Sequence, residues 1–239
     1  MAPDSSTNNS DRQPNVDKQK SKSSENMTGR TTETDSDIIA SAAEAIQSGQ
    51  PVVYPTETVY GLGVDGLNPD AIERVFEIKG REYDNPLSLG VESVSAVARY
   101  TNPSERAMQF IRAFLPGPIT VVVERSPAVP DILTAGRDRV GIRIPDHHMA
   151  LSLLKHAAPT PITATSANQS GAGSIISPDM LDQSIRENVA IVLEAGETTG
   201  TESTVVDPAQ NIIHRRGAMA DAVIAWLSDV AGTRPTINT

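Results

Sequence analysis

The chain has 239 residues and a formal net charge of −10, and its length suits one large domain or two small ones. It contains no cysteine, which excludes disulfides, a thiolate nucleophile and a cysteine-ligated zinc site. No apolar run approaches the roughly 20 residues of a membrane span, and the start of the chain has no hydrophobic signal region, so we expect a cytoplasmic protein without membrane contact.

The first 35 residues are rich in Ser, Thr, Asn, Asp and Lys, and none of Ile, Leu, Phe, Tyr or Trp occurs before Ile38. Such a segment buries too little apolar surface to offset the entropy lost on ordering. We therefore expect a disordered tail over residues 1–35, a folded domain over residues 36–232 and a short C-terminal tail over residues 233–239.

Within the folded domain, helical and extended patterns alternate. Helical periodicity and capping residues, including the Asn-Pro pairs that begin at Asn68 and Asn102, predict helices over residues 37–48, 68–79, 93–100, 103–114, 146–157, 178–188 and 218–230. Short apolar and β-branched runs predict strands over residues 51–54, 86–91, 119–123, 139–144, 161–165, 189–193, 203–206 and 211–214. This interleaving predicts an α/β fold with a twisted mixed sheet and flanking helices.

Several common motifs are absent or incomplete. The glycines of Gly61–Gly66 are spaced as in dinucleotide-binding loops, but the next helix starts only at Asn68, so we interpret the segment as a glycine-rich turn. No Gly-Lys pair precedes a Ser or Thr, and no serine stands in a Gly-x-Ser-x-Gly elbow. His147 and His148 point about 100° apart on a helix and make no metal pair, and the sequence does not assign the ligands of any metal.

Two cations, Lys79 and Arg81, flank a glycine at the end of a predicted helix, where both can point at one site. Only five of the 20 basic residues are lysines, a composition typical of salt-adapted proteins, although an ordinary acidic protein can share it. Lys79 is one of two lysines beyond the predicted tail, which favours a specific task such as contacting a phosphate. Compensation of the helix dipole is the alternative, whereas core packing does not explain the pair.

Arg143 lies in a predicted strand with period-two alternation. Val140, Ile142 and Ile144 share one face, and Gly141 and Arg143 share the other. A glycine beside an arginine makes a floor below a guanidinium, and a guanidinium binds carboxylates through two parallel hydrogen bonds. The alternation therefore predicts either a carboxylate site or a solvated strand face.

Three further segments place polar groups at strand ends. Thr165–Gly171 follows a strand, and its hydroxyls, amides and N–H groups suit a phosphate or a base, or form an ordinary polar turn. Thr201–Asp207 puts hydroxyls at the entry to a strand, and Arg215–Gly217 puts cations at the end of the last strand. An acidic surface disfavours a broad nucleic-acid interface, so a nucleotide in a local basic cavity is the favoured polyanion.

Taken together and in this order, the motifs resemble the YrdC family over residues 38–218. The segments that carry the resemblance are Tyr54–Gly63, Lys79–Arg81, Asn85–Leu87, Leu115–Thr120, Ser166–Asn168 with Ser170–Gly171, and Ser203–Asp207. The resemblance implies a YrdC-like fold with a concave, positively charged cavity. It also implies a nucleotidyltransferase that forms threonylcarbamoyl-AMP and pyrophosphate from L-threonine, bicarbonate and ATP with Mg²⁺, for threonylcarbamoyladenosine modification of tRNA.

The resemblance also assigns residues. Thr58, Arg143 and Ser203 are expected to contact threonine, and a larger set is expected to contact ATP: Arg81, Asn85, Ser166, Asn168, Ser177 and Arg215. Lys79 and Arg81 are expected to be catalytic, with Lys79 and Asn168 completing a Lys-x-Arg and Ser-x-Asn cluster around the phosphates. Such a reaction depends on positioning and charge stabilisation and uses no covalent nucleophile. The expected partners are a downstream threonylcarbamoyl transferase complex and tRNA, with double-stranded RNA binding.

The chain departs from the family pattern at three places. Gly90 stands where many members have a histidine near the threonine pocket, and Arg139 stands where a small hydroxyl residue is common. Residues 172–176 make the loop before Ser177 longer than usual. Longer members carry an additional C-terminal domain, and this chain resembles the single-domain form.

Two other functions fit the resemblance. One is a non-catalytic RNA-binding or ribosome-assembly module of the same fold, which the acidic surface and the complete Lys-x-Arg and Ser-x-Asn motifs disfavour. The other is the YrdC-type module of carbamoyl-transfer hydrogenase maturation proteins, whose cysteine-rich zinc regions this chain lacks. Saturable binding of ATP and threonine without tRNA distinguishes the enzyme from the RNA-binding module.

Overall fold

The computed structural model describes residues 34–238, so most of the expected N-terminal tail lies outside the described residues. The first helix, α1 (Asp35–Gln47), begins two residues earlier than expected because Thr34 caps it. The Thr34 hydroxyl accepts from the backbone N–H of Asp37 at 3.3 Å, and the Asp37 carboxylate accepts from the backbone N–H of Thr34 at 3.1 Å. This capping box satisfies two N–H groups, and it places Thr34 and Asp35 in the domain that we expected to begin at Ser36.

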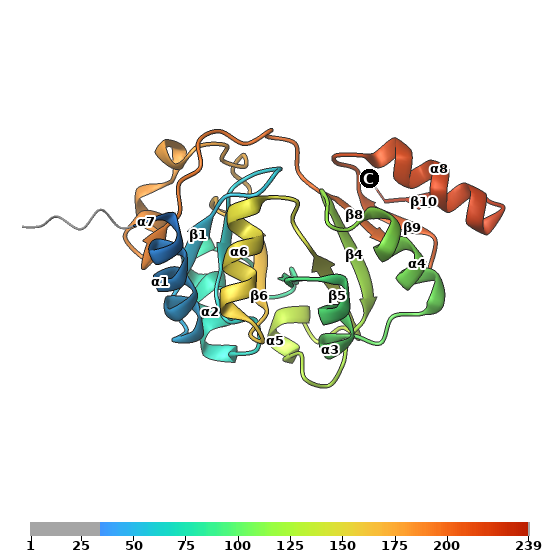
Figure 1. The fold of residues 1–239 in the computed structure, drawn as a ribbon. Helices are drawn as coiled ribbons and strands as arrows, with labels where there is room; N and C mark the ends of the chain where they lie inside the picture. The colour runs from blue at the N-terminus through green and yellow to red at the C-terminus, as the bar shows by residue number, and fades with distance from the viewer. Residues whose placement is uncertain (1–33, 239) are drawn as a thin grey trace, which may run out of the picture. The chain divides into compact units, whose positions relative to one another are not determined.

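Ten strands within residues 34–238 form one mixed sheet in the order β10-β9-β8-β4-β5-β3-β6-β2-β1-β7 (Figure 1). The strands are β1 (Val52–Tyr54), β2 (Gly61–Gly63), β3 (Ser88–Gly90), β4 (Ile119–Glu124), β5 (Arg139–Arg143), β6 (Ile162–Ser166), β7 (Ile191–Val192), β8 (Thr204–Asp207), β9 (Ile212–Arg215) and β10 (Thr236–Ile237). Parallel pairs such as β4/β8 and β3/β5 stand beside antiparallel pairs such as β4/β5 and β2/β6. The expected α/β fold with a mixed sheet is confirmed.

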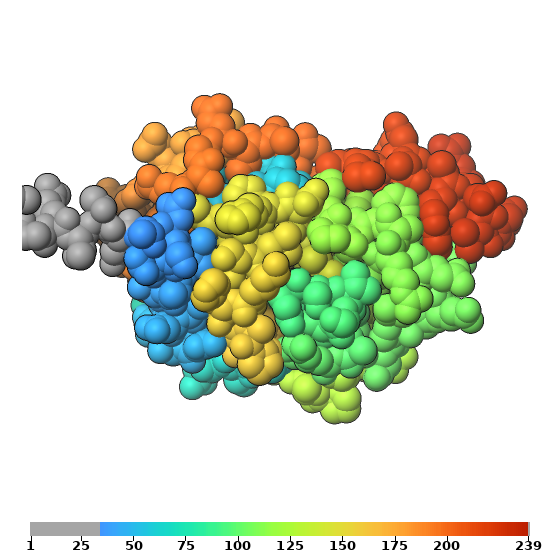
Figure 2. Space-filling view, viewed as in Figure 1, coloured from blue at the N-terminus to red at the C-terminus, as the bar shows by residue number. Residues whose placement is uncertain are grey.

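Helices flank this sheet. Besides α1 they are α2 (Pro69–Lys79), α3 (Val97–Tyr100), α4 (Glu105–Phe114), α5 (Asp131–Thr134), α6 (His148–Ala157), α7 (Gln183–Arg186) and α8 (Ala220–Ala231), with short 3₁₀ turns at Val94–Ala96 and Pro178–Met180. Blue α1 and yellow α6 lie side by side (Figures 1 and 2). α8 packs on α4 through Trp226, whose ring meets that of Phe110 edge-on at 5.0 Å. No helix in the described part of the chain is long and apolar enough to cross a membrane.

Strand β1 shows how the sheet separates two hydrophobic cores. Val52 and Tyr54 pack in one core with residues of α1 and α6, whereas Val53 packs in the other with residues of α2. Successive side chains of a strand point to opposite faces, so this alternation follows directly from the sequence. Both faces of the strand are therefore covered, and its fully apolar sequence is explained.

The first half of the predicted glycine-rich turn is instead strand β2, whereas Gly66 does lie in a turn. A Cβ atom at Gly61 would lie 2.8 Å from the Tyr54 ring, and one at Gly63 would lie 2.3 Å from the Ile162 side chain. Glycine is therefore required because neighbouring strands approach closely, and not because the backbone turns. Helix α2 starts beyond this strand with Asn68 as its cap, so the glycines do not form a helix-leading phosphate loop.

Several element boundaries differ from the prediction. Helix α4 begins at Glu105 because Ser104, and not Asn102, caps it. The expected helix over residues 178–188 is broken into a 3₁₀ turn and α7, which has its own cap at Asp182. The expected C-terminal tail contains β10, which pairs with β9 and whose Ile237 packs against the core.

Candidate functional site

A small polar cavity of about 90 Å³ lies where several strands and loops meet. Its walls come from residues 54–61 and from β3, β4, β5, β6 and β8, and they include Thr120, Arg143, Ser166, Ser203 and Arg215. β8, β4 and β5 are neighbours in the sheet, which brings their polar residues together from distant parts of the chain. Sites that bury drug-sized ligands are typically about 300–1,000 Å³, so the enclosed part of this cavity suits a small polar molecule.

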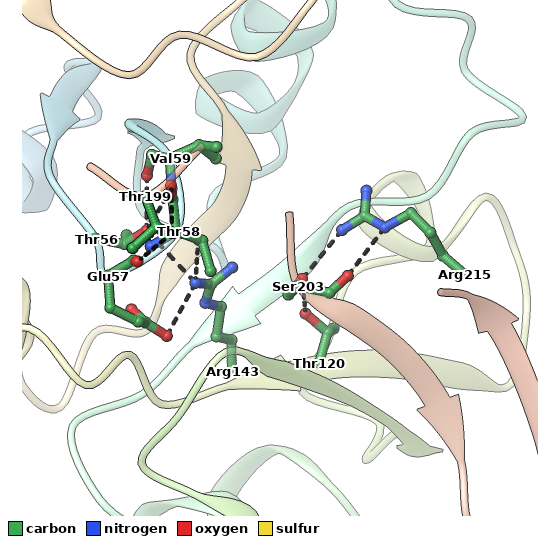
Figure 3. A network of polar contacts seen from close by, with 9 residues as sticks. All are labelled: Thr56, Glu57, Thr58, Val59, Thr120, Arg143, Thr199, Ser203 and Arg215. Atoms are coloured by element: carbon green, nitrogen blue, oxygen red, sulfur yellow. Dashed lines mark hydrogen bonds and ion pairs between the residues drawn. The ribbon is translucent and has the colours of Figure 1, made fainter. Parts of the chain in front are cut away.

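Arg143 is fixed on one side of the cavity by the loop that follows β1 (Figure 3). Its NH2 group donates to the Thr58 hydroxyl at 2.5 Å, to Glu57 Oε1 at 3.1 Å and to the Thr56 hydroxyl at 3.4 Å. The guanidinium side chain is 11% exposed. Thr58 and Arg143, which the resemblance pairs as threonine contacts, are therefore adjacent.

The predicted alternation of β5 is confirmed. Val140 and Ile142 are buried in the hydrophobic core, whereas Arg143 lines the polar cavity. A Cβ atom at Gly141 would lie 2.3 Å from Ser88 Oγ and 2.9 Å from the Thr120 methyl group. Glycine at this position lets two cavity residues approach each other, so Gly141 and Arg143 do form one polar face.

Ser203 and Arg215 form the other side of the cavity (Figure 3). Arg215 donates to the Ser203 carbonyl through Nε at 3.1 Å and to the Ser203 hydroxyl through NH2 at 3.0 Å. That hydroxyl also lies 3.0 Å from the Thr120 hydroxyl, and Arg215 NH1 pairs with Glu202 at 2.6 Å. Sequence reasoning gave no role to Thr120 or Glu202 themselves, although both stand inside or beside segments that carried the resemblance.

Lys79 is almost fully buried, with 2% of the residue exposed. Its ammonium donates to the backbone carbonyls of Ser166 and Asn168, both at 2.5 Å. Burial and, to a smaller extent, the charge of Arg81 lower the pKa of Lys79 to about 8, while Glu202 opposes the shift. The expectation that packing plays no part at Lys79 is wrong, because its side chain holds the loop that follows β6 from within.

Arg81 takes no part in the hydrogen bonds that Lys79 makes to the loop after β6. Its Nε donates to the Asn85 carbonyl and its NH2 to the Pro86 carbonyl, each at 3.0 Å. Burial lowers the pKa of the Arg81 guanidinium, and the charge of Arg215 lowers it further. Burial also lowers the pKa of Arg215, which Glu202 raises and Arg143 lowers. These arginines therefore act on one another and create a field that attracts anions.

Comparison with known proteins identifies the family. A family model named Sua5/YciO/YrdC, described as "Telomere recombination", matches residues 44–217. The chain belongs to the Sua5/YciO/YrdC family. A threonylcarbamoyl-AMP synthase of Pyrococcus abyssi, which is 40% identical over 168 residues, covers 70% of this chain, and one of Bacillus subtilis, which is 38% identical over 180 residues, covers 73% of it.

A solved structure of this family also matches the fold. Sua5 of P. abyssi complexed with L-threonine has a TM-score of 0.75 at 36% identity, over 84% of this chain and 58% of that chain. The matches cover 49% of the P. abyssi synthase and 51% of the B. subtilis synthase. The chain thus spans about half the length of the curated relatives it matches.

Asn168 and Ser177 are both predicted to contact ATP, and the structure gives each a different set of local hydrogen bonds. The Asn168 amide donates to the carbonyls of Gln169 at 2.9 Å and Ala172 at 2.6 Å, and its Oδ1 is buried with no partner within residues 34–238. Ser177 caps a 3₁₀ turn by accepting from the Asp179 N–H at 3.4 Å. No hydrogen bond in the described part of the chain joins Ser177 to the cavity residues.

Gly90 and Arg139, which depart from the family pattern, each have identifiable neighbours in the structure. Gly90 pairs with Arg143 across β3 and β5, and the nearest atom to a Cβ there would be Leu154 Cδ2 at 3.4 Å. Arg139 forms an ion pair at 2.6 Å with Asp207, whose side chain is fully buried. Together they line a neighbouring cavity of about 510 Å³ that shares Ser88 with the polar cavity. The Arg139 position therefore has a local partner that the sequence did not reveal.

Proposed function

We propose that this member of the Sua5/YciO/YrdC family is an L-threonylcarbamoyladenylate synthase. The observation that carries the proposal is the cavity geometry: Arg143, held by Thr58, faces Ser203 and Arg215 across a space suited to a small polar molecule. The relatives named threonylcarbamoyl-AMP synthase and the threonine complex of Sua5 support it. The substrates would be L-threonine, bicarbonate and ATP.

Arg143 would bind the threonine carboxylate, because a guanidinium offers two parallel donors to two oxygens. The hydroxyls of Thr58 and Ser203 would then contact the polar atoms of the same molecule. Bicarbonate and the neutral threonine amine would give a carbamate and release water. A carbamate oxygen would attack the α-phosphorus of ATP while the bond to pyrophosphate breaks.

The ATP phosphates would lie in the field of Arg81 and Arg215, beside the loop held by Lys79. Such chemistry depends on alignment and charge stabilisation. Burial lowers the pKa of Arg81 and of Arg215, and a neighbouring arginine lowers each further, which supports a cluster of cations at this place. Asn85, Ser166, Asn168 and Ser177 complete the proposed nucleotide contacts.

Mg²⁺ would accompany the nucleotide and neutralise charge on its phosphates. No group of three or more His, Cys, Asp or Glu residues in the described part of the chain is arranged for a metal. This fits Mg²⁺ that binds mainly through phosphates and water with one or two carboxylates. Glu202 is the carboxylate on the cavity wall that would serve.

The product would be passed to a threonylcarbamoyl transferase that modifies tRNA. A carbamoyl-adenylate is a reactive mixed anhydride, so a downstream acceptor enzyme is chemically required to use it. The net charge of −10 favours a local tRNA contact over a broad one.

The test is mass spectrometry of products from ATP, L-threonine and ¹³C-bicarbonate. We expect threonylcarbamoyl-AMP carrying one ¹³C and an equal amount of pyrophosphate, with neither product when threonine is omitted. An RNA-binding module of the same fold would instead bind RNA without saturable threonine binding. Absence of the labelled adenylate from folded protein that binds both substrates would reject the proposed function.

A further inference from the structure

The Arg143 guanidinium is bonded through one nitrogen only. All its hydrogen bonds within residues 34–238 use NH2, and all three acceptors belong to the loop of residues 56–58. In this part of the chain the buried Nε has no acceptor, and no hydrogen bond uses NH1. NH1 therefore keeps its donors for a ligand, and an arginine makes charge-assisted hydrogen bonds to a carboxylate. Figure 3 shows NH1 directed toward the side of Ser203 and Arg215.

Glu57 lies on the side of the Arg143 guanidinium that is bonded through NH2. Its side chain is 17% exposed, and it is not among the residues that line the cavity. Its backbone is fixed as well, because the Thr199 hydroxyl donates to the Glu57 carbonyl at 2.9 Å and the Gly200 N–H donates to the Thr58 carbonyl at 2.8 Å. The carboxylate is thus held where it can orient the guanidinium without occupying the ligand space.

We propose that Glu57 is a positioning residue that holds Arg143 with its NH1 group turned to the threonine carboxylate. The inference rests on the proposed function. An arginine side chain loses up to about 2 kcal/mol of rotamer entropy when it is ordered, and a group ordered before binding spares the ligand that cost. Glu57 also offsets the repulsion between Arg143 and Arg215, whose pKa the charge of Arg143 lowers.

The test compares Glu57→Ala and Glu57→Gln with wild type by calorimetric titration of L-threonine and of ATP. We expect Glu57→Ala to weaken threonine binding about tenfold and to leave ATP affinity within about twofold, since the Glu57 carboxylate pairs with Arg143. Glu57→Gln keeps an oxygen that accepts from NH2 and should recover most of the threonine affinity. In steady-state assays the Ala variant should raise KM for threonine more than it lowers kcat.

Two controls separate positioning from a general structural role. Glu92→Ala removes another carboxylate paired with an arginine, at 2.6 Å from Arg99 and 15% exposed, and should leave threonine affinity unchanged. In an Arg143→Ala background, Glu57→Ala should add no further loss of threonine affinity, because positioning has no target there.

Equal losses of threonine and ATP affinity, an additive loss in the double variant, or unchanged threonine affinity in Glu57→Ala would overturn the inference. Wild-type protein that fails to bind threonine or to form the adenylate would instead reject the proposed function itself. If Glu57→Ala does not fold, the Gln variant decides: it must retain threonine affinity within about threefold of wild type.

Discussion

Arg143 and Lys79 carry the same charge but are bound differently by the chain. The Arg143 side chain donates through NH2 to side-chain oxygens of residues 56–58 and leaves NH1 without an acceptor within residues 34–238. Lys79 donates to two backbone carbonyls and is 2% exposed. The first arrangement leaves bonding capacity for a ligand, whereas the second fixes the backbone beside it. The hydrogen bonds that each cation already makes therefore indicate whether it binds a ligand, as proposed for Arg143, or fixes the backbone, as Lys79 does.

The largest expected effect is that of Lys79→Ala. Loss of the ammonium leaves the Ser166 and Asn168 carbonyls without their donor, and a displacement of the loop by 1 Å costs roughly a hundredfold in rate. Product formation should fall by at least about that factor, with faster amide exchange over residues 166–168. Lys155→Ala, which alters the exposed lysine of α6, is the matched control. Normal exchange in the loop together with lost activity would assign Lys79 to direct phosphate contact.

The next largest expected effect is that of changing Arg143, the cation proposed to bind the ligand. Arg143→Lys cannot reproduce a planar two-point fork, so threonine affinity should fall by about 1.5–3 kcal/mol, roughly ten- to hundredfold. ATP affinity should stay near wild type, and calorimetric titration measures both. A fall in ATP affinity alone would place Arg143 in the nucleotide site. Unchanged affinities would mean that it is a solvated strand residue.

Lys79 also predicts a pH dependence of stability. Its folded-state pKa of about 8 lies below the ordinary lysine value of 10.5, so between these values the unfolded chain binds more protons and the free energy of unfolding rises with pH. The full change is about 3 kcal/mol. The measurement is the difference in unfolding free energy between wild type and Lys79→Met from pH 7 to 10.5, in which the titrations of other groups cancel. A difference that stays flat across this range contradicts the buried ammonium.

The smallest effect concerns the wall opposite Arg143. Thr120→Val removes one hydroxyl partner of Ser203 and keeps its shape, so threonine affinity should fall by about 1 kcal/mol, or roughly fivefold. Thr101→Val is the control, because Thr101 is equally buried and its hydroxyl bonds only to the Val97 carbonyl. A loss as large as that of Arg143→Lys would show that the Ser203 side, and not Arg143, dominates threonine binding.

The sequence predicted the interleaved α/β fold and the polar face of β5, because both follow from local periodicity. It missed β2, since the need for glycine at Gly61 arises from the Tyr54 ring of the neighbouring strand. It also missed the burial of Lys79, whose carbonyl partners lie almost 90 residues further along the chain. Glu57 stood within a motif that carried the resemblance, but only the contact with Arg143 gives it a role.

The order of the strands has a consequence for how the protein is made. Arg143 lies on β5, whereas Ser203 and Arg215 lie at the ends of β8 and β9, which join the sheet beside β4. During synthesis from the N-terminus the side of the cavity that Ser203 and Arg215 form is therefore missing until residues 203–215 emerge and dock. Because a ligand stabilises only the state that binds it, the proposed function predicts that threonine stabilises no shorter nascent chain through this site.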